Sequence, residues 1–299
     1  MDVLDIKQLD KSYGPVHAVK QLSLKVNKGQ VFGILGPNGS GKTTTLAMIL
    51  GIISPDSGDY RWFGMEDNPI LHRKIGSLIE TPNFYPYLNL VKNLKLVCRI
   101  KDIDFTEIER VLQLVELWDR RHSKFDTLSY GMKQRLSLAS VLLGDPEVLV
   151  LDEPANGLDP EGIAEVRGII KREAENGKTI LLASHILDEV EKVCSHVAIL
   201  KEGRLIADGE VGALLKGEKV LILASTEPER LMAFLEKHRG VEKFTRDKND
   251  FRVDLKAGVD LISVSRDLLD DGIILSRMEE KKQTLEEQFL ELVSNSKKI

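Results

Sequence analysis

The chain has 299 residues, of which 42% are apolar and 30% charged, and its formal net charge is −5. This length favours two domains of ordinary globular composition. Acidic and basic residues are interspersed, so no nucleic-acid partner is expected, and no apolar run approaches the roughly 18 residues needed to cross a bilayer. The first residues carry no basic segment and no apolar signal core, which predicts a cytoplasmic protein. Cys98 and Cys194 lie in apolar helical patterns and are expected to be buried free thiols.

The N-terminal segment has the pattern of short strands. Leu4–Leu9 is an expected strand, and a turn at Tyr13-Gly14-Pro15 separates it from a second one, Val19–Val26. The second segment alternates apolar and polar residues, which is typical of an antiparallel strand with one solvent-facing side. Val31–Leu35 is wholly apolar and predicts a buried strand.

Residues 36–43, which we call the phosphate loop, follow this buried strand and match the pattern G-x-x-x-x-G-K-[ST] in full. A helix expected at Thr44–Leu50 comes next. A strand, a glycine-rich loop and a helix N-terminus together form a phosphate cradle. Lys42 can reach the β- and γ-phosphates and the Thr43 hydroxyl can hold Mg²⁺, so ATP and Mg²⁺ are the expected ligands. A glycine turn that ends in Lys-Thr by chance is the alternative, and the flanking elements disfavour it.

The middle of the chain reads as strands followed by helices. Thr106 and Glu109 have the form of a capping box. Ser129 and Gly131 precede a helix and predict an anion-binding N-terminus, although helix capping alone also explains them. The expected elements are strands at Gly58–Gly64 and Ile75–Ile79, the latter leading to Glu80, and helices at Leu90–Ile100, Thr106–Leu117 and from Leu128 to about Leu143.

Two carboxylates, Asp152 and Glu153, follow the apolar strand expected at Val148–Leu151. Such a pair at the carboxyl end of a buried strand is costly unless it faces a ligand or cation, so this position predicts a magnesium site and a general base. Asp159 and Pro160 are expected to begin a helix that ends at Gly177. The next expected strand, Thr179–Ala183, delivers Ser184-His185 to the same edge of the sheet. A histidine at a strand end is more often structural, but its place beside the carboxylates favours a site.

The last third of the chain changes character. Strands at Val197–Leu200 and Arg204–Ala207, joined by a turn at Glu202-Gly203, close the first region. Beyond about Gly217 the order β-α-β-β-α-β suggests a split-βαβ, ferredoxin-like unit without a cluster of chemically active residues. The expected elements are strands at Val220–Ala224, Val241–Thr245, Phe251–Leu255 and Ile273–Arg277, and helices at Pro228–His238, Val259–Asp270 and near Thr284–Val293.

Five motifs, in order and spacing, resemble those of an ABC-transporter ATPase subunit: the phosphate loop, LSYGMKQ at 128–134, LVLDEP at 149–154, the Asn156–Asp159 turn and Ser184-His185. The resemblance covers about residues 1–210. It implies an α/β fold of the P-loop NTPase class, with a mixed sheet core and a helical signature subdomain at about 84–143. The cassette is expected to span residues 1–216, and a small accessory α+β domain residues 217–299.

The resemblance also implies a role for each motif residue. Glu153 would be the general base, His185 would contact the γ-phosphate, and Tyr13 would stack on adenine. The residues implied to hold ATP are Gly36, Pro37, Asn38, Gly39, Ser40, Gly41, Lys42, Thr43 and Thr44, and those implied to hold Mg²⁺ are Thr43, Asp152 and Glu80. The residues implied to reach a nucleotide held by a partner subunit are Ser129, Tyr130, Gly131, Met132 and Asp159. Two subunits, expected to be copies of this chain, would close head-to-tail over two ATP molecules.

A separately encoded polytopic permease is the implied membrane partner, and it would hold the chain at the inner face of the membrane. Two departures narrow the resemblance: Tyr130, Met132 and Lys133 replace the commonest signature residues, and Glu80 stands where most relatives have Gln. Both departures resemble the branch that handles bacitracin and lantibiotic self-protection. This branch implies export of, or resistance to, a peptide antibiotic or drug. Glu80 is expected to be one of the catalytic residues.

Three other functions stay open. A soluble ABC ATPase acting on ribosomes or DNA usually has two cassettes or a long coiled-coil insertion, whereas this chain has one cassette and no sustained heptads. An importer subunit of this kind more often ends in small barrel domains. A non-hydrolysing regulator is opposed by the intact Lys42, Asp152 and Glu153.

Overall fold

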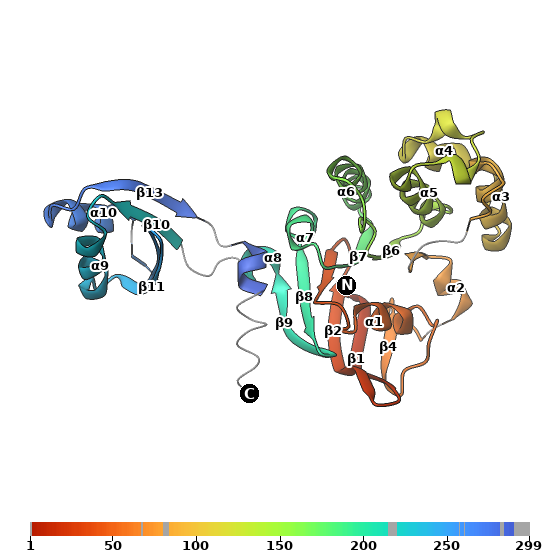
Figure 1. Cartoon of the computed structure of the whole chain (residues 1–299). Helices are drawn as coiled ribbons and strands as arrows, with labels where there is room; N and C mark the ends of the chain where they lie inside the picture. The colour runs from red at the N-terminus through yellow and green to blue at the C-terminus, as the bar shows by residue number, and fades with distance from the viewer. Residues whose placement is uncertain are drawn as a thin grey trace. The chain divides into compact units, whose positions relative to one another are not determined.

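The computed structural model describes residues 2–66, 68–79, 84–214, 220–256, 258–259, 261–281 and 284–289. It separates into two compact units, the first reaching Val211 and the second beginning at Gly212. The first unit contains two sheets and the second unit one (Figure 1). Each unit has its own apolar core. The predicted domain boundary, between residues 216 and 217, falls within 215–219 and so lies outside the described residues. No described helix is both long and apolar enough to span a membrane.

A six-stranded sheet forms the centre of the first unit, in the order β5-β6-β7-β3-β8-β9. Its strands are β3 (Val31–Leu35), β5 (Ile75–Leu78), β6 (Val148–Asp152), β7 (Thr179–Ser184), β8 (His196–Lys201) and β9 (Arg204–Glu210). The first five in the sheet are parallel, and only β9 runs antiparallel to its neighbour. Every residue of β3, β6 and β7 is buried, which explains why these strands read as continuous apolar runs rather than as alternation.

A second, three-stranded antiparallel sheet has the order β2-β1-β4, with β1 at Asp2–Tyr13, β2 at Val16–Asn27 and β4 at Ser57–Trp62. The first two strands are longer than predicted, so Tyr13 ends β1 and pairs with Val16 instead of lying in a loop. Helix α1 (Lys42–Ile49) contacts both β2 and β6 and therefore packs between the two sheets. The Trp62 indole N–H donates to the Ile49 carbonyl at 2.6 Å and fixes the end of this helix.

Helices α3 (Leu90–Lys101), α4 (Glu107–Leu114) and α5 (Tyr130–Leu142) contact one another and form a helical group within the first unit (Figure 1). The predicted capping box at Thr106 is wrong: Thr106 directly precedes α4 with backbone angles that are already helical, and its side chain makes no capping hydrogen bond. Its backbone N–H instead donates to Asp104 Oδ1 at 2.8 Å. The remaining helical segments of this unit are α2 (Pro69–His72), η1 (Trp118–Arg120), η2 (Phe125–Thr127), α6 (Pro160–Glu175) and α7 (Leu187–Val193).

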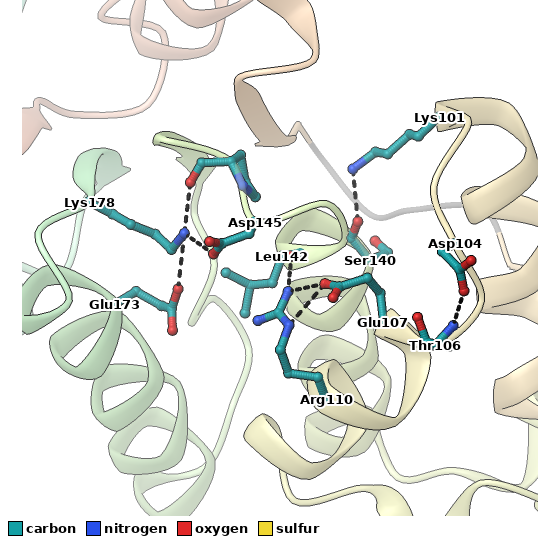
Figure 2. A network of polar contacts seen from close by, with 11 residues as sticks. Lys101, Asp104, Thr106, Glu107, Arg110, Ser140, Leu142, Asp145, Glu173 and Lys178 are labelled. Carbon is teal, nitrogen blue, oxygen red and sulfur yellow. Dashed lines mark hydrogen bonds and ion pairs between the residues drawn. The ribbon is translucent and has the colours of Figure 1, made fainter.

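Polar contacts of Lys178 connect three segments at the amino end of the central sheet (Figure 2). Lys178, directly before β7, donates from Nζ to Asp145 Oδ1 at 2.5 Å and to the Pro146 carbonyl at 2.8 Å. Glu173 Oε2, from the last turn of α6, lies 3.7 Å from the same nitrogen. The hydrogen bond from Lys178 lowers the pKa of the Asp145 carboxyl. A single lysine thus joins the end of α6, the segment before β6 and the start of β7.

The second unit contains a four-stranded antiparallel sheet in the order β11-β12-β10-β13. With the chain order strand-helix-strand-strand-helix-strand, this is the strand order of a split-βαβ arrangement. Leu231 and Leu235 of one helix and Val264 and Leu268 of the other are buried in its core. The elements, with the short α8 that precedes them, are α8 (Val211–Leu214), β10 (Val220–Ser225), α9 (Pro228–Lys237), β11 (Val241–Asp247), β12 (Asp250–Leu255), α10 (Leu261–Asp270) and β13 (Leu275–Lys281). Of the predicted last helix, residues 285–289 are described and helical.

Candidate active site

The phosphate loop leaves the carboxyl end of β3 and turns into α1 at Lys42. Two of its glycines, Gly36 and Gly41, are required by close packing. A Cβ at Gly36 would overlap the Leu200 carbonyl oxygen and Ser40 Oγ, and one at Gly41, which has φ 101°, would overlap the Ala18 carbonyl oxygen. Residues 37–39 of the loop are exposed, whereas Ser40 and Lys42 are buried. The loop therefore presents an accessible outer rim on a tightly packed base.

Lys42 is only 6% exposed, and its ammonium group lies at the centre of the site. Nζ donates to the Gly36 carbonyl at 2.8 Å and to the Pro37 carbonyl at 3.5 Å. Glu153 Oε1 lies 3.6 Å from the same nitrogen. The lysine predicted to bind phosphate is thus curled over its own loop and faces the predicted general base.

Thr43 and Asp152 meet although they are far apart in sequence. Thr43 Oγ1 donates to Asp152 Oδ2 at 2.7 Å. Asp152 is the last residue of β6 and is 6% exposed, while Thr43 is in the first turn of α1 and exposed. A hydroxyl and a carboxylate are the hard oxygen ligands that Mg²⁺ accepts, and Mg²⁺ in nucleotide sites is commonly held by one or two such groups together with phosphates. The two residues therefore fit the role predicted for them.

Glu153 and His185 form a second contact across the same strand ends. His185 Nδ1 lies 2.9 Å from Glu153 Oε2, and the His185 backbone N–H donates to that oxygen at 3.3 Å. Glu153 has φ 47°, in the left-handed region, and its backbone N–H donates to the Ala183 carbonyl at 2.9 Å. An unusual backbone conformation thus aims this carboxylate at Lys42 and His185. The simpler reading, in which Glu153 only caps the turn at Pro154, does not account for these side-chain contacts.

Residues 129–132 of the LSYGMKQ motif lie at a different place, a pocket of about 450 Å³ that we call the signature pocket. Ser129 Oγ accepts the Met132 N–H at 3.3 Å, and Asp159 Oδ1 accepts the Gly162 N–H at 2.8 Å, so both residues cap helices. The Tyr130 ring lies against Gly157, where an added Cβ would come within 3.3 Å of it. The pocket is lined by Ser129, Tyr130, Gly131, Met132, Arg135, Gly157, Leu158, Asp159, Glu161, Gly162 and Glu165.

Three further site residues were predicted from the sequence, namely Tyr13, Thr44 and Glu80. Tyr13 is 48% exposed at the end of the β1–β2 hairpin, and Lys11 Nζ lies 5.8 Å from the centre of its ring. Thr44 follows Thr43 in α1 and is half-buried. Glu80 lies outside the described residues.

Sequence reasoning passed over two residues that support the site. Gln134, which is 5% exposed, donates from Nε2 to the Pro154 carbonyl at 2.8 Å and so joins α5 to the segment that carries Glu153. The Gly203 N–H donates to the Ser40 carbonyl of the phosphate loop at 3.1 Å. The signal for Gln134 was a polar residue on the buried face of α5, and that for Gly203 was the predicted turn itself.

The lysine and threonine of the phosphate loop meet two carboxylates at neighbouring strand ends, and one of these carboxylates also contacts a histidine. This arrangement defines a nucleoside-triphosphate hydrolase of the P-loop class. Residues 19–156 match the family model described as "ABC transporter". The chain belongs to the ABC-transporter ATP-binding proteins, and as a member it is an ATP-binding, ATP-hydrolysing transporter subunit.

The similarity to one relative extends over nearly the whole chain. The bacitracin transport ATP-binding protein BcrA of Enterococcus faecalis is 34% identical over 298 residues, covering 97% of this chain and 96% of that protein. The lantibiotic transport ATP-binding protein SrtF of Streptococcus pyogenes is 38% identical over 208 residues, covering 70% of this chain and 91% of that one. Among solved structures, cbiO1 from Clostridium perfringens, part of the transporter complex cbiONQ, gives a TM-score of 0.66 at 25% identity and covers 79% of this chain and 96% of its own.

Proposed function

We propose that this chain hydrolyses ATP with Glu153 as general base, Lys42 on the β- and γ-phosphates and His185 on the γ-phosphate. The observation that carries the proposal is the position of the Glu153 carboxylate, which lies between Lys42 and His185. A base needs a place near the reacting phosphate and an orienting partner, and these two contacts supply both. The amides and side chains of residues 36–44 hold the phosphates, and the exposed ring of Tyr13 stacks on the adenine.

Mg²⁺ is the metal that we assign to this site, with Thr43 and Asp152 as its protein ligands. When bound, Mg²⁺ neutralises charge on the phosphate oxygens. The 2.7 Å hydrogen bond between Thr43 and Asp152 already brings the two oxygen donors together. We also place Glu80 near the metal and assign it to coupling with the membrane partner.

The signature pocket is proposed to act on a nucleotide held by a second copy of the chain. Its Gly131 and Met132 lie in the first turn of helix α5, which Ser129 caps, and the positive end of the helix dipole there favours an anion. Tyr130 and Asp159 line the same pocket and would be covered by the partner. Head-to-tail pairing then gives two sites, each made of one phosphate loop and one signature pocket.

We infer that hydrolysis powers a separate polytopic permease at the inner face of the membrane, and that the cargo is a peptide antibiotic or related drug. The near full-length similarity to a bacitracin transport ATP-binding protein supports this cargo class. Copurification with a polytopic membrane protein is the expected result. Copurification with ribosomes instead would favour the soluble alternative, and uptake in reconstituted vesicles would favour an importer.

Mixing two inactive variants tests the composite site. Ser129→Arg blocks the signature pocket, and Lys42→Ala disables the phosphate loop, so each pure variant should be inactive. A mixed pair still has one intact phosphate loop facing one intact signature pocket. Activity in the mixture should approach half that of the wild-type dimer per mixed pair. If both variants fold and form mixed dimers yet no activity returns, the head-to-tail arrangement is wrong.

A further inference from the structure

The turn between β8 and β9 is hydrogen-bonded to the base of the phosphate loop. It consists of Glu202 and Gly203, with φ of 49° and 79°, between the paired residues Lys201 and Arg204. Positive φ at both central residues is the type I′ pattern of two-residue hairpins. Glu202 is exposed, whereas Gly203 is buried although it lies at the tip of a turn.

Gly203 makes hydrogen bonds through both its backbone N–H and its backbone carbonyl. Its N–H donates to the Ser40 carbonyl at 3.1 Å, and its carbonyl accepts the Lys20 N–H from β2 at 2.8 Å. The turn thus forms a backbone bridge from β2 to the phosphate loop. The bridge involves no side chain of Gly203, so no polar or charged motif marks it in the sequence.

Close packing around the Ala18 carbonyl group leaves no room for a side chain at Gly203 or at Gly41. A Cβ at Gly203 would lie 2.7 Å from the Ala18 carbonyl oxygen and 3.0 Å from its carbon. A Cβ at Gly41 of the phosphate loop would overlap that same oxygen. Gly41 and Gly203 therefore both lie too close to the Ala18 carbonyl for a side chain to fit between. Gly36 is equally confined by the Leu200 carbonyl at the end of β8.

We propose that Gly203 is a positioning residue for nucleotide binding, because it holds the base of the phosphate loop in the shape that cradles phosphate. The inference rests on residues 36–44 being the nucleotide site, as proposed above. Any side chain at position 203 must displace either Ala18 of β2 or the turn that bonds Ser40. Either displacement moves backbone donors of the loop, and small misplacements of binding groups are costly.

The central experiment compares Gly203→Ala with Gly29→Ala in the full chain. Gly29 has φ 77°, so both substitutions give alanine nearly the same positive φ, but no atom beyond the chain neighbours lies within 4 Å of a Cβ at Gly29. We expect Gly203→Ala to raise the Kd for Mg·ADP and the KM for ATP about tenfold, with kcat at saturating ATP within about twofold. Gly29→Ala should leave all three constants unchanged. A folded Gly203→Ala variant that binds Mg·ADP with wild-type affinity overturns the proposal.

Two additions decide the matter if alanine impairs folding. Asn adopts left-handed conformations more readily than Ala but keeps the Cβ, so Gly203→Asn retains the clash with less backbone strain. In the wild-type chain, Mg·ADP should also slow hydrogen exchange at the Gly203 and Lys20 amides and leave the Gly29 amide unaffected. Protection of residues 36–44 without protection at Gly203 and Lys20 contradicts the proposal. Lys42→Ala separates the two hypotheses: if it too binds Mg·ADP normally, the assignment of the nucleotide site itself is wrong.

Discussion

Two buried lysines lie at opposite ends of the central sheet, and they differ in what surrounds them. Lys42 follows the carboxyl end of β3, whereas Lys178 precedes the amino end of β7, the parallel neighbour of β3. They are 6% and 8% exposed. Lys178 donates to Asp145 and to the Pro146 carbonyl at 2.5 and 2.8 Å (Figure 2). Lys42 has one short bond, to the Gly36 carbonyl at 2.8 Å, and longer contacts at 3.5 and 3.6 Å.

The difference supports a structural role for Lys178 and the phosphate-binding role proposed for Lys42. Lys178 contacts residues at the end of α6 and in the segment before β6, so its ammonium group links parts of the fold to one another. The partners of Lys42 are carbonyls of its own loop and a carboxylate that also contacts His185. The neighbouring loop residues 37–39 are exposed, so phosphate oxygens can reach the ammonium from outside. Burial alone does not distinguish the two lysines, but the number of short hydrogen bonds that each ammonium group makes does.

The largest expected effect comes from Glu153, the carboxylate that faces Lys42. Glu153→Gln keeps the shape of the side chain but cannot accept a proton, so hydrolysis should fall by about 10² to 10⁴, or roughly 3 to 5 kcal/mol of barrier. ATP binding should survive, because the loop amides and Lys42 remain. The variant should therefore trap ATP, and sedimentation with Mg²⁺ and ATP should show a concentration-dependent shift to dimer. Hydrolysis within threefold of the wild type would remove Glu153 from the base role and transfer the search to His185 and Glu80.

Substitution of each of the two lysines by alanine is expected to have the next largest effect. Lys42→Ala should abolish tight ATP binding and leave the thermal midpoint nearly unchanged, since its main proposed partners are phosphates. Lys178→Ala should leave the Kd for ATP unchanged but lower the free energy of unfolding by about 2 to 4 kcal/mol, because it leaves the buried Glu173 without its cation. Calorimetry and nucleotide titration on both variants check the pair. If either variant lost both nucleotide affinity and stability, the distinction between a phosphate-binding and a structural lysine would be wrong.

The sequence predicted the parts of the site that local pattern determines. The phosphate loop, the apolar strand before Asp152-Glu153 and the caps at Asp159 and Pro160 depend on neighbouring residues, and the structure has them where they were expected. It also brings together Lys42, Thr43, Asp152, Glu153 and His185, since parallel strands end at one edge. The Lys178 contacts and the Gly203 bridge could not be predicted, because their partners are distant in sequence and are chosen by packing. The roles of the signature residues and of Glu80 stay predictions.

The smallest effect is a pH dependence at the structural end of the sheet. The hydrogen bond from Lys178 lowers the pKa of Asp145 in the folded chain. A carboxyl with a lowered folded pKa contributes stability above its unfolded pKa, near 3.9, and that contribution is lost as the pH falls through the folded pKa. Because the Asp145 side chain is 73% exposed, solvent screening limits the contribution to about 0.5 to 1 kcal/mol.

Asp145→Asn isolates this contribution, because Asn removes the charge and tolerates the left-handed backbone of position 145, where φ is 50°. Urea unfolding at a series of pH values should show the wild type more stable than Asp145→Asn at pH 6 to 7. The advantage should shrink as the pH falls below the unfolded pKa, near 3.9, and through the lowered folded pKa of Asp145. In a Lys178→Met background the same substitution should have almost no pH-dependent effect, since the hydrogen-bond donor is gone. An advantage that does not shrink as the pH falls, or that survives loss of the lysine, would show that Asp145 stabilises the chain by something other than its contact with Lys178.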